Sequence, residues 1–283
     1  MPVIGITLGD PAGIGPEIVT AALASGKLDA RFEYRVIGET ADARPGEPTP
    51  ATARAALAAL EESARLLRTG GIAAVVTGPV HKARMQAEGF AYPGQTEFFA
   101  ARAGVQNFAM CLTGGSLTVA LVTAHVPLRE VAGLLSASEI IRVGELLAAF
   151  LTTRLGREPR IAVAGLNPHA GESGTLGHEE ITIIAAALAH LPPPIFAGPF
   201  SPDTVFNRAV AGEFDGVLCM YHDQGLIPLK LHAFDSGVNV TLGLPFPRTS
   251  PDHGTAFELA GKNLARPDSM IAAIRLAAEL RAR

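Results

Sequence analysis

The sequence has few of the residues that stabilise small secreted domains or bind nucleic acid. Its 283 residues include two cysteines, Cys111 and Cys219, and no CxxC pair. A disulfide framework is therefore not expected, and both thiols are predicted to lie in the core. Charged residues make up 18% of the chain, the formal net charge is −4, and no basic cluster occurs. These features argue against nucleic acid as a partner.

Long apolar runs and a targeting segment are also lacking. The start, MPVIGITLGD, has no basic stretch and carries Asp10, which is unlike a signal peptide. The uncharged stretch 103–128 is broken by Gly114, Gly115 and Pro127, so we expect two short strands there rather than a membrane span. Together with the unpaired cysteines, these features predict a cytoplasmic protein that contacts no membrane.

Short apolar runs alternate with helix-like segments along the whole chain. Runs that are apolar on both faces are typical of buried parallel strands; they occupy residues 3–7, 34–38, 72–76, 116–123, 160–165 and 216–220. Helices are predicted from Pro16 to Gly26, over 51–69, after a capping box of Ser136 and Glu139, and from Asp268. This alternation predicts an α/β fold with a mostly parallel sheet.

Polar clusters follow the predicted strands. In LGDPAGIGPE, Gly9, Gly13 and Gly15 allow a tight turn after the first strand, and Asp10 is expected to be exposed at the end of that strand. The glycine spacing differs from GxGxxG, which excludes a classical Rossmann fingerprint. The other clusters are TGPVHKARM (77–85), PGQTEFFA (93–100), TAHVPL (123–128), GLNPHAGESG (165–174) and MYHDQGLIPLK (220–230).

Three histidines each stand just past a predicted strand: His125, His169 and His222. Because ligands in open α/β sheets gather beyond the carboxyl ends of the strands, these side chains can converge. Three imidazoles around a divalent cation leave coordination positions open for a substrate. The alternative is that each is a hydrogen-bonded loop residue, which is the interpretation kept for His81, His178, His190 and His232.

Cationic side chains near predicted loop ends in the last third of the chain suggest a site that binds an anion. Lys230 and Arg248 can bind a phosphate monoester, the arginine through a bidentate fork, and Asn239 stands between them in the sequence. Arg248 is conspicuous because LPFPRTS is otherwise uncharged. The alternative for each of these side chains is a solvated position.

The motifs together identify a family resemblance. TLGDPAGIGPE, TGPVHK, GQTEFFA, TAHVPL, GLNPHAGE, SPDT, MYHDQGLIPLK and GVNVTLGLPFPRTSPDHGTAFELAGK resemble the 4-hydroxythreonine-4-phosphate dehydrogenase family of vitamin B6 biosynthesis. GIGPE and HGTAFELAGK are also similar to motifs of isocitrate and isopropylmalate dehydrogenases. The resemblance implies an isocitrate/isopropylmalate-dehydrogenase-like α/β/α fold of two domains, one formed by 1–115 plus 243–283 and the other by 116–242. The active-site cleft would lie between them.

The resemblance also implies an activity. This would be NAD- or NADP-dependent, metal-dependent oxidation of 4-phosphooxy-L-threonine to 2-amino-3-oxo-4-phosphooxybutanoate, which decarboxylates to 3-amino-2-oxopropyl phosphate. The enzyme would be a homodimer with its active site at the subunit interface. His125, His169 and His222 would bind the metal; zinc suits them best, and magnesium or cobalt are alternatives.

Other site residues follow from the same likeness. His253 would lie against the adenine of the nucleotide, with Thr255 and Ala256 lining the pocket. Asp223 and Asp10 are candidates to orient ligands or to relay protons. Gln95 stands where the family usually has histidine. The implied substrate contacts are Gln95, Thr96, Asp203, Lys230, Asn239 and Arg248.

Three alternative functions stay open at this point. Gln95 favours a dehydrogenase that acts on a four-carbon sugar-acid 4-phosphate, such as erythronate or threonate phosphate. A phosphate acyltransferase is a candidate from another class, since such enzymes are also two-domain α/β proteins with a cleft. The third is a metabolite-binding protein without catalysis.

Overall fold

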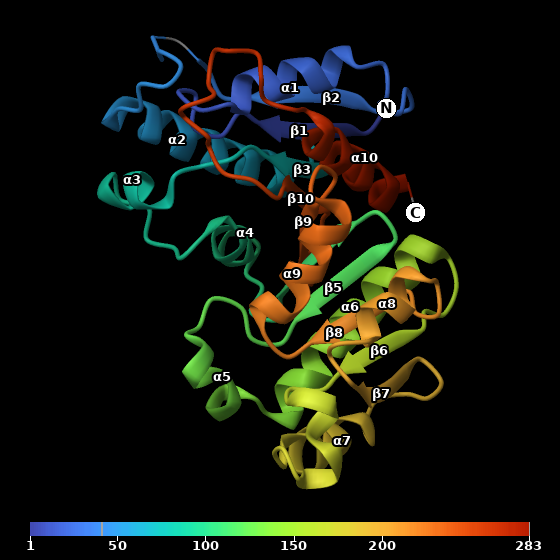
Figure 1. Cartoon of the computed structure of the whole chain (residues 1–283). Coiled ribbons are helices and arrows are strands. Elements are labelled where there is room, and N and C mark those ends of the chain that lie inside the picture. Colours follow the sequence, from blue (N-terminus) through green and yellow to red (C-terminus); the bar gives the residue numbers. More distant parts are fainter. Residues whose placement is uncertain (41, 283) are drawn as a thin grey trace. The chain divides into compact units, whose positions relative to one another are not determined.

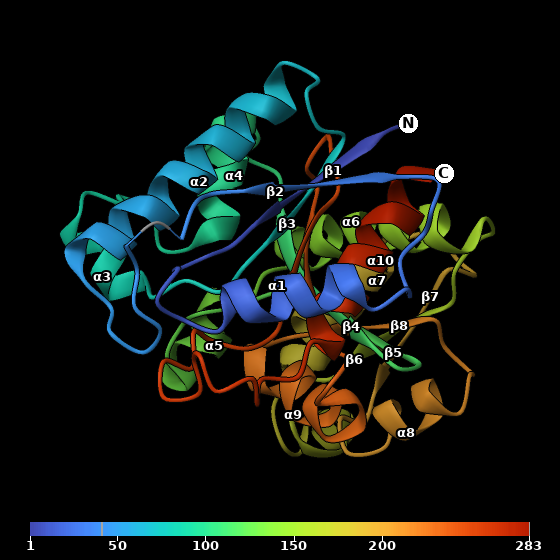
Figure 2. The same ribbon diagram turned by 90° about the horizontal axis from the view of Figure 1, so that it is seen from above.

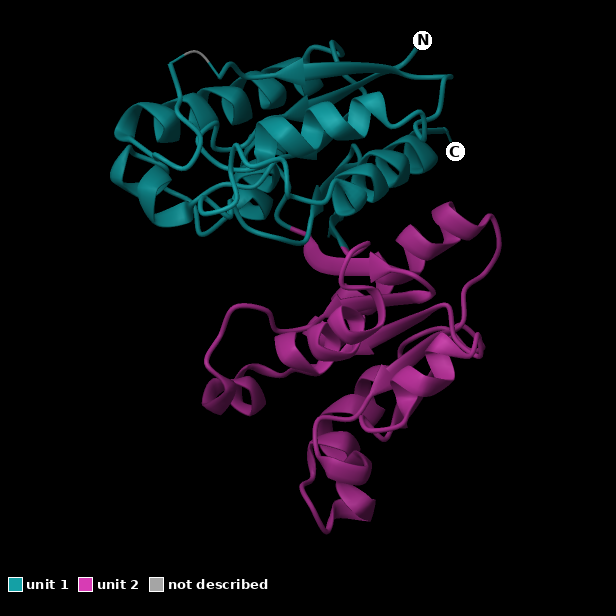
Figure 3. Cartoon of the chain, turned by 45° about the horizontal axis from the view of Figure 1, so that its top comes forward, with its two compact units in different colours: residues 1–106, 238–283 teal, residues 107–237 magenta. Residues whose placement is uncertain are grey.

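The computed structural model describes residues 1–40 and 42–282, and its elements alternate along the chain (Figure 1). The chain divides into two compact units (Figure 3). The first unit consists of Met1–Gln106 and Val238–Arg283, and the second of Asn107–Gly237. The chain thus changes unit after Gln106 and after Gly237, whereas the resemblance puts these crossings near 115 and 243.

The first unit is a sheet covered by helices on both faces. Its strands lie in the order β2 (Glu33–Ile37), β1 (Val3–Thr7), β3 (Ala74–Thr77), β10 (Arg248–Pro251), β9 (Val238–Leu242). Only the β10–β9 pair among these is antiparallel. One face carries α1 (Gly15–Ala24) and α10 (Asp268–Ala282); the other carries α2 (Pro50–Arg68) and α4 (Gln95–Ala103), with α3 (Lys82–Ala87) packed on α2 (Figure 2).

The second unit repeats this layered plan around strands of its own. Its strands lie in the order β4 (Ala109–Gly114), β5 (Leu117–Leu121), β8 (Gly216–Cys219), β6 (Ile161–Ala164), β7 (Phe196–Phe200). The β4–β5 pair is antiparallel, and the β5–β8, β8–β6 and β6–β7 pairs are parallel. Helix α6 (Ala137–Leu155) packs on one face with α7 (Ala185–Leu188), while α8 (Val205–Val210) and α9 (His222–Ala233) pack on the other; α5 is Leu128–Leu134.

The cores confirm the predicted α/β class. In the second unit, Val217 and Cys219 of β8 face the α8–α9 layer together with Leu226 and Leu229 of α9. Both cysteines are fully buried and unpaired, as the sequence predicts. Burial raises the pKa of the Cys111 thiol to about 12, so this thiol is unreactive at neutral pH.

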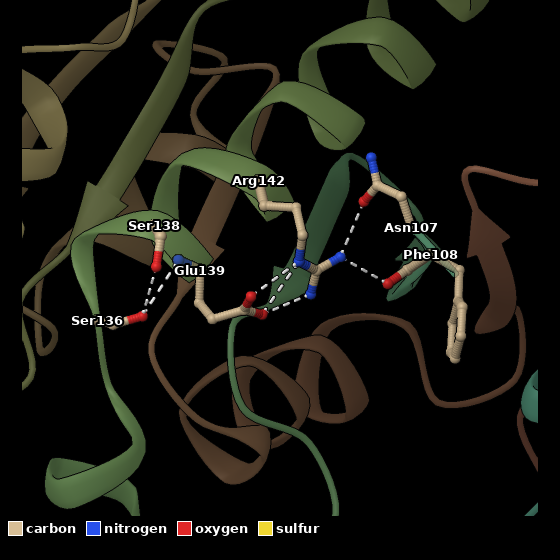
Figure 4. Close-up of polar contacts among 6 residues, drawn as sticks. All are labelled: Asn107, Phe108, Ser136, Ser138, Glu139 and Arg142. Carbon is tan, nitrogen blue, oxygen red and sulfur yellow. Dashed lines mark hydrogen bonds and ion pairs between the residues drawn. The ribbon is translucent and has the colours of Figure 1, made fainter. Parts of the chain in front are cut away.

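Two local predictions can be checked directly. The 103–128 stretch does form two strands, joined at Gly114 and Gly115, and no helix of the described residues is long and apolar enough to cross a membrane. The capping box is only half correct. Ser136 accepts a hydrogen bond from the Glu139 amide, but the Glu139 carboxylate binds the Arg142 guanidinium instead of the Ser136 amide (Figure 4). Arg142 also donates to the Phe108 carbonyl, so the ion pair fixes α6 to the segment before β4.

Candidate active site

The turn after β1 is closed over its aspartate. Gly9 has a φ of 73°, and a Cβ there would lie 2.1 Å from the Pro79 carbonyl oxygen. Asp10 is 1% exposed, and its Oδ1 accepts a hydrogen bond from the Ala12 amide at 3.0 Å. The prediction that Asp10 is exposed at the strand end is therefore wrong, because the glycine-rich turn folds back over the carboxylate.

A buried cation lies at the start of β10. Arg248 is 3% exposed, and its Nη2 donates to Thr77 Oγ1 at 2.7 Å. Its Nη1 makes only long contacts, at 3.3–3.4 Å, with Thr241, Thr96 and Asn239. Its Nε is buried without a hydrogen-bond partner among the described residues. Burial lowers the pKa of Arg248 to about 10, which still leaves the guanidinium charged at neutral pH.

Helix α4 begins beside this arginine. Its N-cap is Gly94, which provides no side-chain cap, so the first backbone N–H groups of the helix have no side-chain acceptor at the cap. The next residue, Gln95, donates from Nε2 to the Gly78 carbonyl at 3.2 Å, while its Oε1 is buried without a partner among the described residues. The guanidinium, the Thr96 hydroxyl and a helix N-terminus together favour an anionic ligand.

The predicted cofactor loop follows β10 in the same unit. The carbonyl of Thr255 accepts from the Ile14 amide at 2.9 Å, and a Cβ on Gly13 would lie 2.8 Å from that carbonyl oxygen. The loop is thus packed closely against the turn after β1. Ala256 has a φ of 40°, and His253 Nε2 is buried with no hydrogen-bond partner in the described chain. Strained backbone and an unpartnered buried polar atom are both features that occur at ligand sites.

Two of the three predicted metal ligands lie together in the second unit. The imidazole ring centroids of His125 and His222 are 5.5 Å apart. Asp223 Oδ1 is 2.6 Å from His222 Nδ1, which favours the tautomer that leaves Nε2 unprotonated. These side chains line a pocket of about 250 Å³ that also involves Tyr221 and Leu128.

The third histidine is not grouped with these two. His169 Nδ1 lies 3.9 Å from Asp203 Oδ2, and both side chains are well exposed. Among residues 1–40 and 42–282, no three His, Cys, Asp or Glu side chains are close enough to bind one metal ion. Strand order alone does not explain the difference, because β8 lies between β5 and β6; His169 stands apart in a left-handed turn that follows β6.

The predicted substrate residues divide between the units. Gln95, Thr96, Asn239 and Arg248 belong to the first; Asp203 and Lys230 belong to the second, where Lys230 is exposed on α9. A hydrogen bond from Ser201 and the nearby His169 lower the pKa of the Asp203 carboxyl.

Sequence reasoning missed Thr77 and Thr241, which contact Arg248. Thr241 could have been found from the sequence, because it stands two residues after Asn239 in the same predicted strand region. Two polar residues two apart on a buried strand lie on one face of the sheet.

Comparisons with known proteins show which family the chain resembles. The family model described as pyridoxal phosphate biosynthetic protein PdxA matches residues 17–277. The chain is 43% identical to a 4-hydroxythreonine-4-phosphate dehydrogenase of Desulfosudis oleivorans over 98% of this chain and 95% of that protein. A protein of the same name from Bradyrhizobium diazoefficiens is 46% identical, over 95% of this chain and 81% of its own length. The crystal structure of a Klebsiella pneumoniae protein with that name has a TM-score of 0.84, 35% identity and coverage of 99% and 100%.

More distant structures share the fold alone. Isocitrate dehydrogenase of Methylococcus capsulatus has a TM-score of 0.52 at 18% identity, and covers 98% of this chain and 84% of its own. A branched-chain phosphotransacylase of Enterococcus faecalis has a TM-score of 0.62 at 14% identity, with 99% of each chain covered. These likenesses confirm the predicted isocitrate-dehydrogenase-like fold class.

Proposed function

The chain belongs to the PdxA family of pyridoxal phosphate biosynthetic proteins, and from this premise we propose that it oxidises 4-phosphooxy-L-threonine with NAD or NADP. The product, 2-amino-3-oxo-4-phosphooxybutanoate, then loses carbon dioxide to give 3-amino-2-oxopropyl phosphate. Relatives at 43% and 46% identity carry the name of this dehydrogenase. The observation that carries the proposal is the buried Arg248, which has an unused Nε donor beside the N-terminus of α4.

Arg248 and α4 suit the phosphate of the substrate. A guanidinium without a hydrogen-bonded carboxylate can offer a fork of donors to a phosphate, and such charge-assisted hydrogen bonds are the strong ones. The Thr96 hydroxyl and the first amides of α4 add neutral donors. Because Gln95 Nε2 already donates to the Gly78 carbonyl, Gln95 Oε1 is suited to accept from a hydroxyl or ammonium group of the substrate.

His125 and His222 suit a divalent cation. The two rings lie together, and the Asp223 carboxylate orients one of them as second-sphere carboxylates orient metal-binding histidines. Imidazole ligands favour zinc, with cobalt or magnesium as alternatives. When a cation is bound, the chemistry supplied is Lewis-acid polarisation of the substrate hydroxyl, which lowers the hydroxyl pKa before hydride transfer. His169 is the third proposed ligand.

The nicotinamide cofactor is proposed to lie against the loop that contains His253, Thr255 and Ala256. The unpartnered His253 Nε2 supports this position, because a buried ring nitrogen without a partner is expected to meet one when a ligand is bound. Ala256 of the same loop has a positive φ, a strained conformation of the kind that occurs at ligand sites.

A homodimer with the active site at its interface completes the proposal. Ile227, Leu231 and Phe234 are 66%, 88% and 77% exposed, and their spacing puts them on one face of α9. An exposed apolar stripe of this kind favours burial against another chain. Because α9 begins at His222, a second copy on this face would lie beside the helix that carries this histidine.

A second candidate differs only in the substrate. A sugar-acid 4-phosphate has a hydroxyl where 4-phosphooxy-L-threonine has its amine, and Gln95 in place of the usual histidine favours this alternative. The likeness to the phosphotransacylase does not support acyl transfer as the activity, because at 14% identity it shows a shared fold alone.

The deciding experiment compares substrates on the purified protein. We expect 4-phosphooxy-L-threonine, but not erythronate 4-phosphate, to give reduced nicotinamide, and a chelator should abolish the reaction until zinc or cobalt is restored. Turnover of the sugar acid alone would establish the second candidate. Acyl transfer from coenzyme A without nicotinamide reduction would overturn both.

A further inference from the structure

A buried hydrogen-bond chain in the second unit connects the loops that carry all three histidines. Its centre is the backbone of Met220, which is fully buried and lies two residues before His222. The Met220 carbonyl accepts from the Thr123 hydroxyl at 2.7 Å and from the Thr123 amide at 3.2 Å. Since Thr123 lies two residues before His125, these bonds hold the His125 loop to the His222 loop.

Gln224 extends the chain to the third loop. It is 6% exposed in the first turn of α9. Its Oε1 accepts from the Met220 amide at 2.7 Å, and its Nε2 donates to the Gly165 carbonyl at 2.7 Å. The orientation of the carboxamide is fixed, because only its oxygen can accept from an N–H and only its NH2 can donate to a C=O. One side chain thus joins the end of β8 to the end of β6.

The segment between Gly165 and His169 is also fixed by buried hydrogen bonds. Glu180, which is 3% exposed, accepts with Oε1 from the Leu166 and Asn167 amides, both at 2.7 Å. A Cβ on Gly171 would lie 2.6 Å from Glu180 Oε2, so the loop closes directly around this carboxylate. Residues 169–173 all have φ between 43° and 77°, a left-handed turn that non-glycine residues adopt only when their surroundings enforce it.

We propose that Gln224 is a positioning residue that sets the His169 loop relative to His125 and His222. The inference rests on the proposed function, since it assumes that these histidines bind a metal. Gln224 contacts no histidine directly, and it acts through the backbone of Gly165 and Met220. Losing its two bonds would leave a buried N–H and a buried C=O unpaired, which the two loops can relieve only by moving.

The test measures metal binding by the full-length protein without relying on turnover. Metal-free Gln224→Leu and Gln224→Glu are titrated with cobalt, and the visible spectrum of the bound ion is recorded. We expect both variants to bind cobalt about tenfold more weakly than the unmodified protein and with a changed spectrum, as for other supporting residues of metal sites. Glu keeps the acceptor for Met220 but sets a carboxylate against the Gly165 carbonyl, so it should not rescue binding.

Thr118→Val is the matched control. It removes a buried hydrogen bond of 2.8 Å to Thr113, at the opposite end of β5 from His125. We expect it to lower the melting temperature and to leave cobalt affinity and spectrum unchanged.

A purely structural Gln224 would give variants that melt earlier yet bind cobalt as the unmodified protein does, and this result in either folded variant would overturn the inference. If Gln224→Leu does not fold, Gln224→Glu decides. Failure of the unmodified protein to bind cobalt would overturn the proposed function, and the inference with it.

Discussion

The two candidate functional clusters of this chain, one in each unit, are built in opposite ways. In the first unit, Arg248 is 3% exposed on a strand, and hydroxyl groups of neighbouring strands already contact its guanidinium. In the second, the His169 side chain is 64% exposed and stands in a left-handed turn beyond a strand end. The first cluster is buried and its contacts are already made, whereas the second includes an exposed loop residue that stands apart from His125 and His222.

This contrast indicates how each cluster contributes to the free energies of folding and of ligand binding. A buried charge destabilises the ligand-free protein, here offset in part by the Coulombic attraction of Glu97, and an anion that binds there finds its donors already oriented. Exposed histidines cost little on folding, so their affinity depends on the backbone that holds them in place. Substitutions in the first cluster should therefore change stability and binding in opposite directions, while those in the second should change binding alone.

The largest effect is expected from His169→Ala. We predict that turnover is abolished because a metal ligand is lost, while the melting temperature stays nearly unchanged because the side chain is exposed. Turnover, metal content and thermal unfolding are measured together. His178→Ala, an exposed histidine of the same segment, is the control and should remain active. Full activity with stoichiometric metal in His169→Ala would remove this residue from the site.

Arg248→Met comes next. Loss of two charge-assisted hydrogen bonds to the phosphate, at about 1.5–3 kcal/mol each, predicts a fall in kcat/KM of about 10²–10⁴-fold. The ligand-free protein should be as stable as before or more stable, since an unpaired buried charge is removed. Arg248→Lys, which keeps the charge but not the fork, should be intermediate. Unfolding at a lower temperature with an unchanged KM would show that Arg248 is a structural residue.

The sequence predicts the fold and the family better than it predicts the geometry of the site. Strand and helix alternation predicts the layered α/β fold, and the motifs identify the family, as the comparisons confirm. Local patterns are sufficient here because burial on both faces and glycine punctuation act over a few residues.

Contacts that depend on tertiary closure could not be predicted in this way. Asp10 stands in a glycine-rich turn, and nothing local shows that the Pro79 segment closes over it. The left-handed turn at His169 has the same origin, because its anchor, Glu180, lies on the next helical segment. Arg248 could be singled out from its isolation in an apolar segment, whereas its contact with Thr77 joins residues 171 positions apart.

Asp223→Asn tests whether the exposed cluster depends on its supporting groups. The change removes the charge of the carboxylate whose Oδ1 lies 2.6 Å from His222 Nδ1, and it keeps the size of the side chain. We expect cobalt to bind about 10–100-fold more weakly, with little change in the melting temperature. Asp235→Asn, an exposed position of the same unit, is the control. Equal cobalt affinity in both variants would show that His222 needs no orienting carboxylate.

The smallest effect is expected from His253→Ala, which returns to the first unit. His253 Nε2 is buried and has no hydrogen-bond partner in the described part of the chain, and its Nδ1 lies 3.2 Å from the Gly254 carbonyl oxygen. If the ring lies against the adenine, about 1–3 kcal/mol of stacking is lost, by analogy with base stacking on aromatic side chains. At about 1.4 kcal/mol per tenfold change, the Kd of the nucleotide should rise by about one order of magnitude.

The stability of the ligand-free protein should be unchanged or slightly raised in this variant, because an unsatisfied buried nitrogen disappears. This again sets the first unit apart from the second. Calorimetric titration with NAD and NADP gives the affinity, metal analysis should show no change, and His190→Ala serves as an exposed control in the other unit. Loss of bound metal with unaltered nucleotide affinity would mean that His253 belongs to the metal site and not to the cofactor loop.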